Sequence, residues 1–162
     1  MKWKQKNGYT LIEILVVLTI IGLLFSLGYV NFRDFSRRQA LIGATSSVQG
    51  DLRLAQSNAI SGQKPSDCGV SNTLESYSFN ITSTALPSEY KIEANCGGAP
   101  VVVKDVILSD ISLSMPSTNP LKFKILGQGT NLDGVTDWTL NLTQNVTGKT
   151  ATVTVTSGGE IK

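Results

Sequence analysis

Glu13 is a lone carboxylate inside an apolar stretch of the sequence. Its neighbours are Leu11, Ile12 and Ile14, and the run from Ile14 to Val30 contains no charged residue and no proline. An ionised side chain at the centre of a membrane helix costs about 2.5–3.5 kcal/mol on insertion scales. This cost indicates a functional role, namely pairing with a cation in a place that water does not reach. The alternative is that Glu13 rests at headgroup level near the end of a membrane helix.

Other residues with catalytic chemistry are scarce in this chain. The sequence contains no histidine, which removes Ser-His-Asp and Cys-His catalysis and histidine-based metal sites. Its two cysteines, Cys68 and Cys96, both follow the apolar stretch. A cysteine pair in an exported domain is expected to form a disulfide, and two free buried thiols are the alternative.

Three oxygen-bearing side chains, Asn131, Asp133 and Asp137, fall in one glycine-containing loop. They are weak candidates for a calcium site, because their spacing matches no complete cage of ligands. A plain turn built on Asp133 and Gly134 is the preferred interpretation. We therefore expect no metal, no cofactor and no enzymatic activity.

The apolar stretch is long enough to cross a bilayer, because a helical span needs about 20 mainly apolar residues and residues 9–30 supply them. The end nearest the N-terminus is expected on the cytoplasmic side, so the bulk of the chain is expected outside the cytoplasm. No small-residue cleavage site follows Val30, so the stretch is expected to be retained. Basic residues flank the stretch on both sides: Lys2, Lys4 and Lys6 precede it, and Arg33, Arg37 and Arg38 follow it. The three arginines are expected to contact lipid.

The segment Gly8-Tyr9-Thr10-Leu11-Ile12-Glu13, after its short basic leader, resembles the type III signal of prepilins and pseudopilins. In that family a peptidase cuts after the glycine, the new N-terminal residue is methylated, and a glutamate four residues further on joins the assembly contact. The resemblance implies that residues 1–8 are a leader cleaved after Gly8, that Tyr9 is methylated, and that Glu13 is the assembly glutamate. It also implies three partners: prepilin peptidase, membrane lipid and other pilins of the same filament. The family usually has phenylalanine where this chain has Tyr9.

The remaining sequence predicts a helix followed by a sheet. We expect helix from Tyr9 to about Ser61, in which residues 9–30 form the membrane and assembly part and residues 31–62 lie on a globular core. The pattern behind the second part is the recurrence, at spacings of three and four, of Leu41, Thr45, Val48, Leu52, Ala55 and Ala59. Residues 63–162 hold alternating runs typical of strands, separated by glycine turns, at 77–81, 121–125, 138–142 and 151–155. The expected fold class is α+β: a pilin-like fold with a long N-terminal helix packed on a C-terminal antiparallel β-sheet domain.

The second half resembles protein H of type II secretion (GspH) and the FimT-like minor pilins. The similar features are the segment from Asp51 to Ile60, a strand and glycine turn from Phe123 to Gly129, and a terminal hairpin. The resemblance implies a minor pseudopilin, a structural subunit of a type II secretion pseudopilus or type IV pilus-like filament. Such a subunit is anchored by one span in the inner membrane, with its globular domain outside the cytoplasm, and is assembled into a periplasmic or surface filament.

The alternative within this branch is a minor pilin for DNA uptake, which binds DNA through arginines in the C-terminal tail. The tail Ser157–Lys162 of this chain contains no arginine. Of the 14 basic side chains three lie in the leader, which leaves 11 against 12 acidic ones after cleavage. No basic field for a polyanion remains, so nucleic acid is not expected as a partner.

Overall fold

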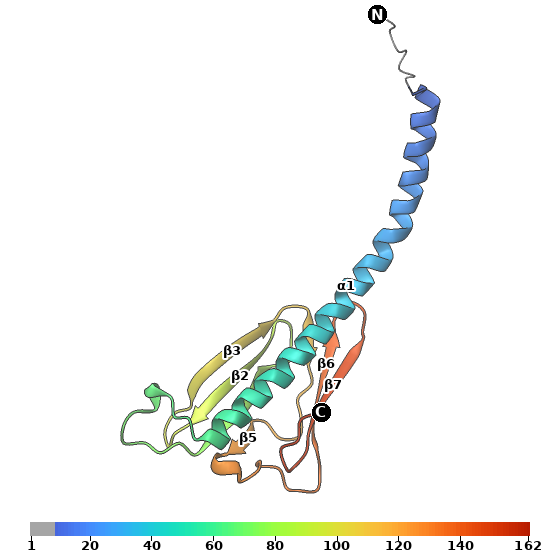
Figure 1. The fold of residues 1–162 in the computed structure, drawn as a ribbon. Coiled ribbons are helices and arrows are strands. Elements are labelled where there is room, and N and C mark those ends of the chain that lie inside the picture. Colours follow the sequence, from blue (N-terminus) through green and yellow to red (C-terminus); the bar gives the residue numbers. More distant parts are fainter. Residues whose placement is uncertain (1–8) are drawn as a thin grey trace, which may run out of the picture. The chain divides into compact units, whose positions relative to one another are not determined.

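The computed structural model describes residues 9–162, and it describes the side chains in that range except those of residues 26–31. The chain divides into two units, Met1–Arg37 and Arg38–Lys162. The elements in order are α1 (Leu11–Ser61), η1 (Ser66–Cys68), β1 (Ser76–Ser83), β2 (Ser88–Asn95), β3 (Val101–Leu108), β4 (Ile111–Leu113), β5 (Leu121–Lys124), η2 (Ile125–Gly127), β6 (Trp138–Gln144) and β7 (Thr150–Val155) (Figure 1). The expected α+β class and the long N-terminal helix are confirmed.

The strands form two antiparallel sheets, where the sequence had suggested one. The first has the order β3-β2-β1-β5, and the second has the order β4-β6-β7. The four runs predicted from alternation correspond to β1, β5, β6 and β7. The prediction missed the three strands between Ser88 and Leu113, which are β2, β3 and β4.

The expected amphipathic stripe of α1 is confirmed except at Thr45, which is only half-buried, and it provides one wall of the core. Leu41, Val48, Leu52, Ala55 and Ala59 are buried and pack with the inward-facing side chains of both sheets. The part of α1 in the second unit accordingly lies across the strands (Figure 1).

Aromatic side chains fill the space where the two sheets and the helix meet. Phe79 of β1 stacks on Tyr90 of β2 with ring centroids 4.8 Å apart, and it meets Trp138 of β6 edge-on at 5.8 Å. The indole Nε1–H of Trp138 donates a hydrogen bond of 2.8 Å to the carbonyl oxygen of Thr118. The one polar atom of this bulky side chain is therefore satisfied, as burial requires.

α1 ends at a glycine whose conformation only glycine adopts without strain. Gly62 has a φ of 62°, and its N–H donates to the carbonyl oxygen of Ala59 at 3.2 Å while Gln63 N–H donates to Asn58 at 3.1 Å. This pair of bonds is the Schellman arrangement, which satisfies the last carbonyls of a helix. The chain then enters a loop in which Cys68 is joined to Cys96 by a disulfide, with Cα atoms 5.7 Å apart.

A buried carboxylate links α1 to the first sheet. Asp51 is only 5% exposed although it lies on the helix. Its Oδ2 accepts a 2.8 Å hydrogen bond from the hydroxyl of Tyr90, and its Oδ1 lies 2.6 Å from the Nζ of Lys104. Tyr90 belongs to β2 and Lys104 to β3, so one aspartate fixes the helix against two neighbouring strands. The sequence pattern gave no sign of this contact.

Replacing Asp51 should destabilise the fold more than replacing its basic partner. Asp51→Ala should lower the free energy of unfolding by about 1–3 kcal/mol, because it leaves the hydroxyl of the fully buried Tyr90 without an acceptor. Lys104→Gln should cost less than about 1 kcal/mol, since the lysine side chain is 45% exposed and water replaces its partner. Chemical denaturation of the full chain in detergent, followed by circular dichroism, measures both. Equal losses would contradict this account.

The same contact predicts loss of stability at alkaline pH. Burial raises the pKa of Tyr90 above its ordinary value of 10.0, and the hydrogen bond and negative charge of Asp51 raise it further. Above about pH 10 the unfolded tyrosine has lost its proton while the folded one keeps it, so the free energy of unfolding falls as pH rises. Tyr90→Phe should flatten this decline in denaturation curves measured at increasing pH. Tyr9→Phe is the control, because Tyr9 is 80% exposed and should leave the decline unchanged.

Candidate functional site

The start of α1 is fixed by Thr10. The backbone N–H of Glu13 donates to the carbonyl oxygen of Thr10 at 3.1 Å and also lies 3.4 Å from its hydroxyl oxygen. A threonine followed three residues later by glutamate is the sequence signature of a capping box, and a glutamate in the first turn also complements the helix dipole. Sequence reasoning singled out Glu13 for its cost in lipid but missed this second, local role, which the spacing of Thr10 and Glu13 would have revealed.

Glu13 and the predicted new N-terminal residue share one side of the helix. Tyr9, Glu13 and Val17 recur every four residues and border the same shallow hollow, of about 380 Å³, on the surface of α1. Tyr9 is 80% exposed and Glu13 is also exposed. Gly8, the predicted last residue of the leader, lies outside the described residues.

Apolar side chains cover the rest of the first turns of α1. Exposed apolar side chains occupy nearly every position of this segment, so none of its faces is polar. They belong to Leu11, Ile12, Ile14, Leu15, Val16, Val17, Leu18, Ile20, Ile21, Leu23, Leu24 and Phe25. The hydroxyl of Thr19 is turned back on the helix and donates to the carbonyl oxygen of Val16 at 2.7 Å. A helix that is apolar all round is one that is buried in its working state.

Within the part of the chain that the structure describes, no helix combines the length and hydropathy needed to cross a membrane.

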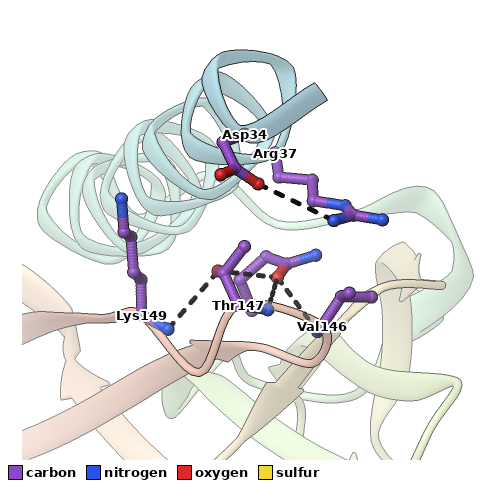
Figure 2. Close-up of polar contacts among 6 residues, drawn as sticks. Asp34, Arg37, Val146, Thr147 and Lys149 are labelled. Atoms are coloured by element: carbon purple, nitrogen blue, oxygen red, sulfur yellow. Dashed lines mark hydrogen bonds and ion pairs between the residues drawn. The ribbon is translucent and has the colours of Figure 1, made fainter. Parts of the chain in front are cut away.

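The arginines that follow the apolar stretch are not equivalent. In the first unit, Arg37 approaches Asp34 one helical turn earlier, with Nη1 and Oδ1 3.9 Å apart (Figure 2). In the second unit, Arg38 is exposed. Arg38 has no ion pair among the described residues.

The loop proposed as a weak calcium candidate is used for turn formation. Oδ1 of Asp133 accepts hydrogen bonds from the N–H groups of Val135 and Thr136 at 3.1 and 3.3 Å, and these bonds lower the pKa of Asp133. The side-chain amide of Asn131 is used elsewhere: its Oδ1 accepts a hydrogen bond from the N–H of Lys122 in β5, and its Nδ2 donates to the carbonyl oxygen of Pro120. Among the described residues, no group of three histidine, cysteine, aspartate or glutamate side chains could hold a metal ion.

The C-terminal tail is held on the second sheet. Thr154 of β7 and Lys162 exchange backbone hydrogen bonds at 3.1 and 2.9 Å, and the side chain of Lys162 lies 3.2 Å from Glu160. Gly159 reaches the helix, where its carbonyl oxygen accepts a 2.8 Å bond from Gln56 Nε2. A Cβ at position 159 would lie 2.8 Å from that nitrogen, and the φ of 89° is a second reason for glycine.

Comparison with known proteins finds similarity in the N-terminal segment and over most of the chain. Residues 3–29 match the family model described as the prokaryotic N-terminal methylation motif. Two curated relatives, both named fimbrial protein and both from Pseudomonas aeruginosa, are 24% identical to the chain over 149 residues, which cover 89% of this chain and 90% of each relative. No solved structure matches. The motif, the α+β fold and the fimbrial relatives together support a relationship to the type IV pilin superfamily.

Proposed function

We propose that this chain is a minor subunit of a pilus-like filament, a type II secretion pseudopilus or a type IV pilus. In this proposal the prepilin peptidase removes residues 1–8, Tyr9 becomes a methylated N-terminus, and the apolar part of α1 anchors the subunit in the membrane before assembly. The role is structural rather than enzymatic. The names of the two relatives support a filament subunit, and the resemblance of the second half to protein H of type II secretion supports a minor one.

The observation that carries the proposal is the surface of the first turns of α1. Twelve apolar side chains between Leu11 and Phe25 are at least 42% exposed in the single chain. Each fully buried side chain of this kind contributes about 1.5–3 kcal/mol, so packing these helices side by side is strongly favoured over exposing them to water. The same surface is stable in lipid, which allows one segment to serve as anchor and later as filament core.

Glu13 gives that packing its specificity. Once surrounded by apolar helices, its carboxylate needs a cation, and cleavage after Gly8 creates one in the amine of Tyr9. A neighbouring subunit shifted along the filament axis brings its amine to the carboxylate of the first. Each charge then neutralises a partner that is otherwise costly in an apolar medium. Because the cation exists only after cleavage, assembly is restricted to processed subunits.

Processing should depend on the absence of a side chain at position 8. In cells with prepilin peptidase, mass spectrometry of the mature protein should find methylated Tyr9 at the N-terminus. Gly8→Val should block cleavage, because a branched side chain hinders the backbone conformations and close approach that glycine allows. Gly22→Ala is the matched control, since a Cβ there meets nothing within 4 Å, and it should be cleaved normally. Recovery of filaments that keep residues 1–8 would exclude this step.

Substituting Glu13 should separate membrane insertion from assembly. Glu13→Leu and Glu13→Gln should insert at least as well as the native chain and should still be cleaved, because a charge is removed from an apolar run. Incorporation into filaments should fall more than a hundredfold, since leaving one member of a buried ion pair without its partner costs about 3–5 kcal/mol.

Cell fractionation measures the three quantities for each Glu13 variant: membrane content, processed fraction and filament fraction. Glu75→Gln removes an exposed carboxylate of the second unit and is the matched control. Normal incorporation of both Glu13 variants would show that Glu13 rests at headgroup level and only caps the helix.

A further inference from the structure

A groove of about 550 Å³ lies within the second unit, between α1 and the start of β7. The helix α1 contributes residues from one face, at spacings of three and four, and the β6–β7 hairpin contributes three consecutive residues. The lining comprises Arg38, Leu41, Ile42, Thr45, Ser46, Lys149, Thr150 and Ala151. None of the functions assigned above to the first turns of α1 uses this groove.

The groove combines an apolar floor with two cations. Leu41 is buried, and Ile42 keeps 47% of its surface exposed beside it. Arg38 and Lys149 are both exposed, and neither forms an ion pair among the described residues. Hydroxyl groups of Ser46 and Thr150 complete the polar part of the lining. Such a surface fits an amphipathic anion, whose charge meets the cations while its apolar part covers the floor.

The backbone of Lys149 is held in place by the β6–β7 loop. The Oε1 of Gln144, which is 3% exposed, accepts hydrogen bonds from the N–H groups of Val146 and Thr147 at 3.0 and 2.6 Å and from the Thr147 hydroxyl at 2.8 Å. The N–H of Gln144 donates to the carbonyl oxygen of Lys149 at 2.8 Å. Figure 2 shows the Lys149 side chain pointing away from this bonded loop. The ammonium group of Lys149 is therefore carried by a backbone segment that hydrogen bonds hold in place.

We propose that this groove binds the headgroup of an anionic phospholipid, with the phosphate between Arg38 and Lys149 and the apolar floor against the glycerol and first acyl carbons. The inference rests on the proposed membrane anchoring. Arg38 follows the end of the apolar stretch at Val30 by only eight residues of sequence, so a subunit anchored by that stretch keeps the groove tethered close to the headgroup layer.

The groove thus gives the anchor a selectivity that an apolar helix lacks. Packing of α1 in lipid is indifferent to headgroup charge, whereas two cations on one groove favour an anionic lipid over a zwitterionic one. Each basic residue near an anionic surface contributes roughly a fivefold change in binding, the equivalent of about 1 kcal/mol. An anionic lipid held at Arg38 and Lys149 would have to be released when the subunit leaves the membrane for the filament.

Chemical protection of Lys149 tests the proposal on the full chain. The protein is reconstituted into vesicles of phosphatidylcholine alone or of phosphatidylcholine with phosphatidylglycerol, and exposed lysines are acetylated with a membrane-impermeant reagent. Mass spectrometry then compares Lys149 with the exposed Lys124 of β5 in the same molecules. Phosphatidylglycerol should slow acetylation of Lys149 relative to Lys124 by about fivefold or more. Arg38→Gln should remove most of this protection, and Arg53→Gln, an exposed arginine of α1 outside the groove, should not.

Three results would overturn the inference. Equal acetylation of Lys149 in both kinds of vesicle excludes a headgroup site. If the protein nevertheless floats with both kinds of vesicle, the membrane anchoring is correct and only the lipid site in the groove is rejected. Protection by inorganic phosphate in phosphatidylcholine vesicles indicates a site for soluble anions. Protection that appears only in assembled filaments, whatever the lipid, assigns the groove to an acidic segment of a neighbouring subunit. Failure to float with either vesicle would reject the membrane anchoring itself.

Discussion

The fold of the second unit depends on one stripe of α1 that two sheets share. The sheets are separate in their hydrogen bonding, and the same buried helix side chains, Leu41 to Ala59, pack against both. A sheet with an apolar face must bury that face against another element, and here the helix supplies the apolar partner for both sheets. The helix stripe therefore does more than cover a sheet: it is the common surface on which both sheets are assembled. Asp51 makes the packing of the helix on the first sheet specific, because its two carboxylate oxygens accept hydrogen bonds from side chains of β2 and β3.

The two parts of α1 face different requirements, and their residues differ accordingly. The second part is buried on one side by its own chain, so it has a stripe and a polar face. The first part is apolar on nearly all sides, and its apolar side chains are exposed in the single chain. A carboxylate is tolerated there because it lies in the first helical turn, where Thr10 caps the helix and the dipole favours negative charge. In the proposed filament the same carboxylate exchanges this local role for an ion pair between subunits.

Much of this structure follows from local patterns. The three- and four-residue spacing from Leu41 to Ala59 predicted which helix side chains are buried, and alternation located β1, β5, β6 and β7. β2 alternates just as regularly, with Tyr90, Ile92 and Ala94 buried between polar residues, so that strand was open to prediction and was missed. β3 was harder to predict, since it is an edge strand whose side chains are mostly exposed and do not alternate. β4 also alternates, with Ile111 and Leu113 more buried than Ser112, but three residues are too few for alternation to predict a strand.

By itself the sequence indicated the superfamily, the long helix and the position of the carboxylate in the N-terminal signal, because these depend on residue order within a few helical turns. Only the tertiary structure decided the division into two sheets, the burial of Asp51 beside Tyr90 and Lys104, the contact of Gln56 with Gly159, and the groove that brings Arg38 to Lys149. The contacts of Asp51, Gln56 and Arg38 each join residues at least 39 positions apart. Periodicity reports which face of an element is buried, and it carries no information about which distant element buries it.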